Sequence, residues 1–182
     1  MMELTALEAR RVLDRTEPVA LGALLREVAS SAQTAATSRN VRIRIDGLRE
    51  DIGEAHVDGD RFLLRQAIGN LLDNAIDFAP AGSQVVLALR LAARQNAVIT
   101  VRDRGPGIPD YAQGKVFEKF YSLARPHSQK KSTGLGLAFV QEIAALHRGR
   151  IELGNAKDGD GAVATLTLPL AHGAKDSRRM AL

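Results

Sequence analysis

Two pairs of strand-like segments, each joined by a short turn, constrain the fold of this chain most strongly. Residues 84–91 and 97–102 form the first pair, and residues 150–153 and 163–168 form the second around a Gly- and Asp-rich turn at 155–161. Helical patterns lie between the two pairs. Adjacent hairpin-like pairs interleaved with helices favour a mixed sheet with helices on one face over a doubly wound parallel sheet. We therefore expect a two-layer α/β sandwich.

Amphipathic segments supply the expected helices. Residues 20–37 place Leu and Val at helical spacing, and Gly59-Asp60 precedes a helix that should end near Phe78, because Pro80 cannot continue it. A third helix is expected from Gly136 to about His147. The remaining expected elements are short strands at 41–45 and 55–57, and a helix at 1–14 that looks like the end of a longer one and is broken at 16–18.

Composition narrows the class of protein. The 182 residues, 45% of them hydrophobic, suit one domain with appendages. The chain has no cysteine, which excludes disulfides and thiolate metal sites and fits the cytoplasm. No apolar run approaches a membrane span and no secretory leader opens the chain, so we expect this fragment to be soluble. The net charge of +4 is scattered and only two Tyr and five Phe are present, which disfavours a nucleic-acid partner.

The first motif is Asn70-Leu71-Leu72-Asp73-Asn74-Ala75, on the helix that Pro80 ends. Asn70, Asn74 and Asp77 recur three or four residues apart, so they share a face opposite the apolar stripe. Asn is a poor helix former, and two of them one turn apart can offer carbonyl oxygens to a hydrated Mg²⁺. An ordinary solvated helix face is the alternative.

The second motif, Asp103-Arg104-Gly105-Pro106-Gly107-Ile108-Pro109, follows a strand directly. Two glycines allow the backbone to approach a flat ligand closely, and an Asp carboxylate can accept a hydrogen bond from an exocyclic amine such as that of adenine. A plain turn is the alternative, because D-x-G is common in turns.

The third motif, Ser132-Thr133-Gly134-Leu135-Gly136-Leu137, opens a helix after a polar, basic stretch at 122–133 that we expect to be a mobile loop. Glycines here expose backbone N–H groups at the positive end of a helix, which suits phosphate oxygens. The motif is not a P-loop, because no G-K-[ST] follows. A glycine-started helix without a ligand is the alternative.

In this order, and with Phe117-Glu118-Lys119-Phe120 between the second and third, the motifs resemble the ATP-binding domain of sensor histidine kinases. That family belongs to a superfamily with gyrase, a heat-shock chaperone and the MutL repair proteins. The resemblance covers about residues 20–169. The stretch 117–137 looks most like the CreC type of sensor kinase.

The resemblance implies a Bergerat-type α/β sandwich that binds ATP and Mg²⁺ beneath a mobile lid at 122–133. It implies that Asn74 ligates the metal, Asn70 lies beside the phosphates, Phe78 lies near adenine and Asp103 bonds its amino group. The full set of nucleotide-binding candidates is Asn70, Asn74, Asp77, Phe78, Asp103, Gly105, Gly107, Ile108, Thr133, Gly134, Leu135, Gly136 and Leu137.

One departure concerns the phosphate charge. Many family members carry Lys or Arg where this chain has Asp77, so another cation must neutralise the phosphates. The candidates are Lys119 and Arg125, with Lys130 and Lys131 in the same loop. No catalytic residue is assigned beyond these candidates.

Two features favour a kinase whose phosphate acceptor lies elsewhere. ATP-hydrolysing members carry Glu four residues before the metal-binding Asn, where this chain has Asn70, whose amide cannot act as a general base. None of the four histidines has the acceptor context: His147 is expected to be structural, and His56, His127 and His172 to be surface residues. The acceptor is therefore expected on a separate helical hairpin upstream.

This interpretation divides the chain into residues 1–17, the end of the hairpin helix and a linker; 18–170, the catalytic domain; and 171–182, a disordered tail. The expected partners are the hairpin and a response regulator. The intact protein is expected to be a homodimer anchored in the inner membrane, whereas this fragment is expected to be a monomer that cannot phosphorylate itself. The alternatives are a protein-serine kinase of the anti-sigma type and a non-catalytic nucleotide-binding or scaffold module.

Overall fold

The computed structural model describes residues 13–49, 55–93, 95–119, 121, 123 and 136–171. The helix expected at 1–14 lies almost wholly outside the described residues, as do the lid apart from Leu123 and the tail from residue 172.

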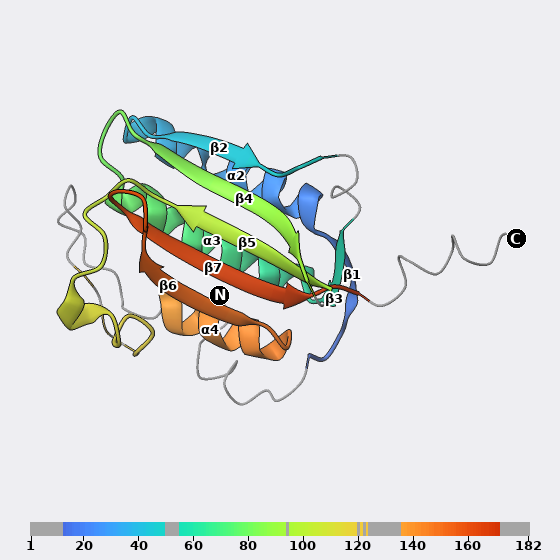
Figure 1. The fold of residues 1–182 in the computed structure, drawn as a ribbon. Coiled ribbons are helices and arrows are strands. Elements are labelled where there is room, and N and C mark those ends of the chain that lie inside the picture. Colours follow the sequence, from blue (N-terminus) through green and yellow to red (C-terminus); the bar gives the residue numbers. More distant parts are fainter. Residues whose placement is uncertain are drawn as a thin grey trace, which may run out of the picture.

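A five-stranded sheet forms one layer of the molecule, in the order β2-β4-β5-β7-β6 (Figure 1). Strand β2 runs parallel to β4, and every other neighbouring pair is antiparallel. The sheet is therefore mixed, as the two hairpin-like pairs predicted. Its strands are β2 (Arg42–Asp46), β4 (Gln84–Ala92), β5 (Asn96–Arg102), β6 (Arg150–Asn155) and β7 (Ala162–Pro169).

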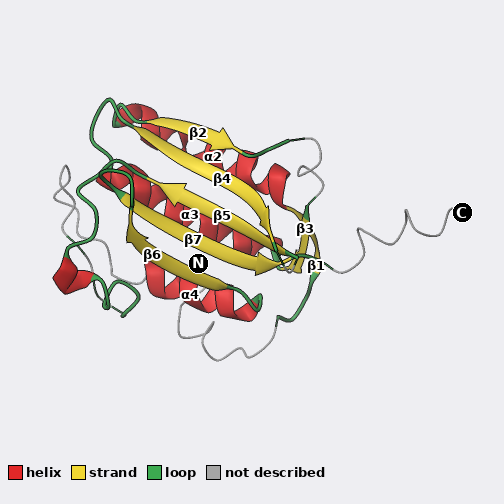
Figure 2. Ribbon diagram, viewed as in Figure 1, coloured by secondary structure: helices red, strands yellow, loops and turns green. Residues whose placement is uncertain are grey.

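Three helices form the second layer, and Figure 2 shows them on the same face of the sheet. They are α2 (Leu21–Ser38), α3 (Arg61–Phe78) and α4 (Gly136–Leu146). Alternate strand residues such as Leu87, Ile99 and Leu166 are fully buried against these helices. The predicted sandwich with helices on one face is confirmed.

Helix α3 has the boundaries that its sequence predicts. Asp60 is the N-cap residue, and its side chain accepts a hydrogen bond of 3.1 Å from the backbone N–H of Leu63. The helix ends at Phe78 because Ala79 is extended (φ −68°, ψ 133°), the conformation favoured before a proline. The cap and the proline set the length of α3, and its apolar stripe sets which of its residues face the sheet.

A small two-stranded sheet at one end of the molecule was not fully predicted. Strand β1 (Glu17–Ala20) pairs antiparallel with β3 (His56–Gly59). The sequence suggests only a break here, because Pro18 cannot donate a ladder hydrogen bond; the structure tolerates it in a short strand that pairs on one side. A 3-10 turn, η1 (Asp110–Ala112), is also additional to the predicted elements.

His147 fastens the end of α4 to the beginning of α3. Its Nδ1 lies 2.7 Å from the carbonyl oxygen of Ile143, and its Nε2 accepts a hydrogen bond of 3.0 Å from the backbone N–H of Asp60. The side chain is buried, and burial lowers its pKa. A structural role for His147 is therefore supported. Of the other histidines, His56 is half-buried in β3, whereas His127 and His172 lie outside the described residues.

Candidate functional site

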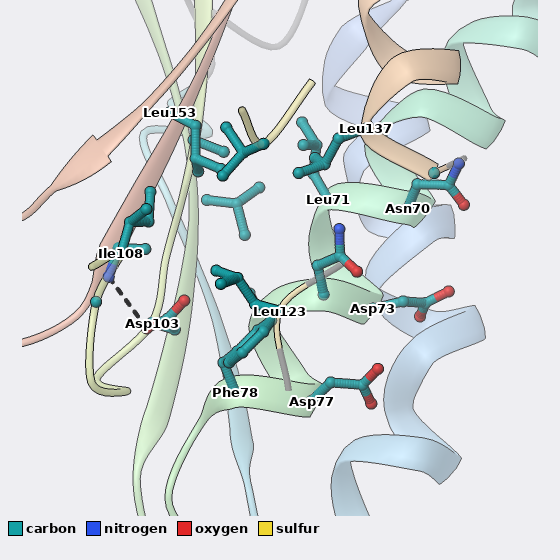
Figure 3. Close-up of a pocket in the computed structure, with 18 of the residues that line it drawn as sticks. Asn70, Leu71, Asp73, Asp77, Phe78, Asp103, Ile108, Leu123, Leu137 and Leu153 are labelled. Atoms are coloured by element: carbon teal, nitrogen blue, oxygen red, sulfur yellow. Dashed lines mark hydrogen bonds between the residues drawn. The ribbon is translucent and has the colours of Figure 1, made fainter. Parts of the chain in front are cut away.

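A cavity of about 290 Å³ opens between α3, the end of β5, the loop that follows it, and the first turn of α4 (Figure 3). Polar groups are concentrated on α3 and at Asp103, and most of the remaining wall is apolar, with Phe78 and Tyr121 as its aromatic residues. The lining residues are Asn70, Leu71, Asp73, Asn74, Ala75, Asp77, Phe78, Val101, Asp103, Gly107, Ile108, Val116, Tyr121, Leu123, Gly136, Leu137, Leu153, Ala162 and Ala164.

Helix α3 brings four of the predicted residues to this cavity. Asn70, Asn74, Asp77 and Phe78 all line it, because positions i, i+4, i+7 and i+8 fall on one face of a helix. The opposite face of α3, which includes Leu64 and Ile68, is fully buried. The same helix therefore anchors the core and presents two amides and, with Asp73, two carboxylates to the cavity.

Asp103 is the most buried polar residue in the cavity wall, with 5% of its surface exposed. Its Oδ1 accepts hydrogen bonds from the backbone N–H groups of Gly105, at 2.8 Å, and Ala162, at 3.1 Å. Neither bond uses Oδ2. Burial raises the pKa of this carboxyl, while the two backbone donors and the nearby Arg102 counteract part of that rise. The arrangement fixes the carboxylate and leaves one oxygen for a ligand N–H.

The glycines of the Asp103–Pro109 loop allow close backbone contacts. A Cβ on Gly105 would lie 2.5 Å from the carbonyl oxygen of Phe78, so the loop can touch the end of α3 only because this residue has no side chain. Gly107 adopts φ +78°, a conformation that glycine adopts readily. Gly107 lines the cavity, whereas Gly105 shapes it from behind.

Asn155, which the sequence analysis did not single out, holds this loop in place. Its Oδ1 accepts a hydrogen bond of 2.6 Å from the N–H of Ile108, and its Nδ2 donates one of 3.0 Å to the carbonyl of the same residue. The two residues are 47 positions apart, so no local pattern links them. In the sequence, the only sign of this contact was that Asn155 begins a Gly- and Asp-rich turn.

The wall beside Ile108 is a small apolar cluster. Buried Ile108, Ala112 and Val116 form it, and Leu123 and Leu153 pack against it. Of these residues, Ile108 was predicted to line the site, and Leu123 was predicted to belong to the lid. The others come from η1, the segment that follows it and β6, whose arrangement depends on the tertiary fold.

The phosphate-side candidates are only partly described. Gly136 and Leu137 begin α4 and line the cavity. Lys119 is exposed and is not among the lining residues. The remaining candidates, Thr133, Gly134, Leu135, Arg125, Lys130 and Lys131, lie outside the described residues.

Negative charge gathers on the α3 side of the cavity. Burial, and then the neighbouring Asp77, raise the pKa of Asp73. Arg39, which follows the last residue of α2, lies near Asp77, with Nε 3.8 Å from Oδ1 and Nη1 3.3 Å from the Asp77 backbone oxygen. In Figure 3 the side chains of Asn70, Asp73 and Asp77 point away from the Asp103 end of the cavity. The two ends of the cavity therefore differ in polarity.

Oxygen donors on this side suit a hard cation. Asn74 offers an amide oxygen, and Asp73, Asp77 and Asn70 lie within two turns of it on α3. Mg²⁺ binds oxygen ligands, usually few from the protein and the rest from water and phosphate. The residues present therefore fit this ion.

The family comparison matches residues 59–172 to the model described as "Histidine kinase-, DNA gyrase B-, and HSP90-like ATPase". The sensor protein CreC of Escherichia coli K12 is 39% identical over 168 residues, covering 90% of this chain and 34% of CreC. The sensor-like histidine kinase SenX3 of Mycobacterium tuberculosis H37Rv is 35% identical over 170 residues, covering 93% of this chain and 40% of SenX3. The chain thus spans roughly a third to two fifths of these relatives.

Solved structures agree with the sequence relatives. Full-length ShkA in complex with AMPPNP is 27% identical with a TM-score of 0.75, and the match covers 92% of this chain and 34% of ShkA. The mycobacterial sensor histidine kinase MprB is 25% identical with a TM-score of 0.70, covering 85% of this chain and 97% of the MprB chain. The predicted likeness to the CreC type is confirmed. The chain belongs to the histidine kinase-, DNA gyrase B- and HSP90-like ATPase family, and within it to the catalytic domains of sensor histidine kinases.

Proposed function

We propose that this chain binds Mg²⁺-ATP in the α3–β5 cavity and transfers the γ-phosphoryl group to a histidine on a separate helical hairpin. The observation that carries the proposal is the buried Asp103, whose Oδ1 is held by two backbone N–H groups while Oδ2 takes no part in those bonds. A fixed carboxylate oxygen in a mostly aliphatic pocket suits the exocyclic amine of adenine. ShkA, of the same fold, is known with AMPPNP.

The α3 side of the cavity takes the phosphates in this proposal. Asn74, with Asn70 one turn before it, holds the metal, and the first turn of α4 at Gly136 offers backbone N–H groups to the phosphates. When bound, Mg²⁺ neutralises the charge that develops on the transferring phosphoryl group. Asp77 adds negative charge here, so positive charge must come from the metal and from cationic side chains elsewhere in the chain.

Asn70, one helical turn before Asn74, favours transfer of the phosphoryl group over hydrolysis of ATP. Asn70 lines the cavity at this position, and its amide has no basic group that could take a proton from water. Bound ATP is therefore left for an acceptor brought by another domain. Positioning and charge stabilisation supply most of the catalysis of phosphoryl transfer, so a domain that only orients the nucleotide can act as the catalytic partner.

Because this chain spans only about a third to two fifths of its relatives, the remaining domains and the partner proteins are also proposals. Residues 1–17 are proposed to end the hairpin helix and link it to a catalytic domain at 18–170, with residues 171–182 as a tail. The intact protein is proposed to be a homodimer held at the inner membrane that signals to a response regulator, and ThkA, of the same fold, is known in complex with the response regulator TrrA. No helix in the described part of this chain has the length and hydrophobicity of a membrane span.

Labelled ATP tests the proposal directly. The chain is incubated with [γ-³²P]ATP and Mg²⁺, alone and with a separately purified hairpin domain from the same kinase. We expect no covalent label on this chain alone and acid-labile label on the hairpin, because phosphohistidine is hydrolysed by acid. Acid-stable label on a serine would support the anti-sigma type of kinase. Nucleotide binding without any transfer would support a non-catalytic module.

The matched control for this experiment is Asp58→Asn. Asp58 is an exposed carboxylate of β3, in the small sheet, and it does not line the cavity. This variant should transfer label as the wild type does, whereas Asp103→Asn should not.

A further inference from the structure

The sheet face opposite the helices carries a second hollow, a groove of about 400 Å³. Its residues alternate along the strands with core residues, so they point away from the nucleotide cavity. In the register of the sheet, Val86 lies between Arg44 and Arg102, and Arg102 lies opposite Val163. The groove is lined by Arg44, Asp46, Gln84, Val86, Thr100, Arg102, Arg104 and Val163.

Positive charge exceeds negative charge in this groove. Arg44 is neutralised by Asp46, with Nε 2.8 Å from Oδ1. Arg102 pairs with Asp158, with Nη1 2.9 Å from Oδ1, but that carboxylate is 74% exposed. Arg104 is exposed and forms no salt bridge with a described residue. One solvent-screened carboxylate therefore serves two guanidinium groups.

Both guanidinium groups lie near Gly159 in the turn between β6 and β7. A methyl group on Gly159 would lie 3.6 Å from Nη1 of Arg104 and 3.8 Å from Nη2 of Arg102. Two positive charges beside the same residue repel each other, so an additional anion near both would lower their energy.

Arg102 also leaves hydrogen-bond donors unused. Its Nε and Nη2 are buried and have no hydrogen-bond partner among the described residues. These two nitrogens form the edge of a guanidinium that binds a carboxylate through two parallel hydrogen bonds. A carboxylate can reach this buried edge only if the Arg102 side chain, a quarter of which is exposed, changes conformation. Such a ligand would satisfy donors that the free domain leaves without a partner.

We infer that this groove binds an acidic segment of a partner protein, with an Asp or Glu carboxylate between Arg102 and Arg104. A polypeptide fits better than a nucleic acid, because none of the eight lining residues is aromatic and so none offers a surface on which a base could stack. Val86, Thr100 and Val163 give the groove a floor that an extended segment can contact with apolar side chains.

The groove and the nucleotide cavity lie on opposite sides of β5. Arg102 lines the groove and the next residue, Asp103, lines the cavity, so the two sites share a strand without overlapping. The partner can therefore dock while nucleotide is bound.

The test is an NMR titration of the ¹⁵N-labelled chain with the peptide acetyl-Glu-Val-Glu-Val-Glu-Val-amide, in the presence of ADP and Mg²⁺. We expect saturable shifts centred on β4 and β5 near Val86 and Arg102, with a dissociation constant on the order of 1 mM. The same peptide with Gln in place of Glu should cause no such shifts.

Three variants make the test specific. Arg102→Lys keeps the positive charge but removes the two parallel N–H donors of the guanidinium. Arg104→Gln removes one positive charge from an exposed side chain. Each substitution should weaken peptide binding by about tenfold. Arg90→Gln, an exposed arginine of β4 that does not line the groove, should bind as the wild type does. Unchanged ADP binding shows that each variant is folded.

Two results would overturn the inference. The first is peptide binding that is absent or that Arg102→Lys and Arg104→Gln leave unchanged. The second is a single-stranded oligonucleotide that occupies the groove more tightly than the acidic peptide.

Discussion

The two ends of the nucleotide cavity are built in different ways. At the Asp103 end, side chains are buried and bonded to the backbone: Asp103 is fixed by Gly105 and Ala162, and Ile108 is held by both amide atoms of Asn155. At the α3 end, Asp77 is 40% exposed beside Arg39. The Asp103 end, where we propose that adenine binds, is therefore preorganised by the domain alone. The α3 end, the proposed phosphate side, needs a metal and further residues to become complementary to a polyphosphate.

The largest effect should come from Asp103→Asn. Its amide oxygen can still accept from the two backbone N–H groups, but then the NH₂ group replaces Oδ2 and faces the adenine amine, donor against donor. Calorimetry should show ADP affinity reduced about 30- to 100-fold, which corresponds to roughly 2–3 kcal/mol for a mispaired buried group. An affinity within threefold of the wild type would show that adenine does not bind at this carboxylate.

Gly105→Ala tests the close packing behind the adenine end. The new Cβ would lie 2.5 Å from the carbonyl oxygen of Phe78, so the loop must shift. We expect a loss of about 1–3 kcal/mol of unfolding free energy, measured by urea denaturation. Gly114→Ala is the matched control, because a Cβ there has no heavy atom within 4 Å. Equal stability of the two variants would contradict the close contact.

Asn74→Ala tests the metal at the other end of the cavity. Removing the amide oxygen should reduce the affinity for ADP about tenfold when Mg²⁺ is present. In EDTA the variant and the wild type should bind ADP equally, which serves as the internal control. A similar loss in both conditions would mean that Asn74 acts on the nucleotide without a metal.

His147 gives the structure a pH dependence that is separate from the cavity. Burial lowers its folded pKa below 6.5, so the unfolded chain binds this proton more readily, and stability falls as the pH drops below about 6.5. At pH 7.5, His147→Gln should cost about 1–3 kcal/mol of unfolding free energy, and it should then lose less than the wild type between pH 7.5 and 5.5. His56→Gln is the control, and an unchanged pH slope in His147→Gln would refute the assignment.

Asp77→Asn should have the smallest effect, and in the opposite direction. Removing a half-exposed negative charge beside the phosphates should raise the affinity for metal-free ADP about two- to fivefold, because screened charges contribute at most about 1 kcal/mol. Calorimetry in EDTA measures this, with Asp58→Asn as the control at the far sheet. A decrease in affinity would indicate that Asp77 contacts the nucleotide favourably.

The sequence predicts the elements whose signals are local. The α3 boundaries follow from Asp60 and Pro80, and its cavity face follows from helical spacing. The two strand pairs follow from short turns. In each case neighbouring residues carry the information, so tertiary context is not needed to read it.

The features that were missed depend on contacts distant in sequence. Asn155 clamps Ile108 across 47 residues, and Leu153 reaches the cavity only because β6 lies at the edge of the folded sheet. Strand β1 was missed because Pro18 suggests a break, while its pairing with β3 is a tertiary property. Lys119, a candidate on charge alone, is exposed and does not line the cavity, so its contact with the phosphates stays a prediction.

A calorimetric titration of the wild-type chain with ADP, with and without Mg²⁺, shows whether the cavity binds nucleotide. We expect one saturable site whose affinity for ADP rises when Mg²⁺ is added, because the domain preorganises the proposed adenine end and the metal completes the proposed phosphate end. No detectable binding at millimolar ADP in either condition would contradict this expectation, and the cavity would then have to be explained without a nucleotide.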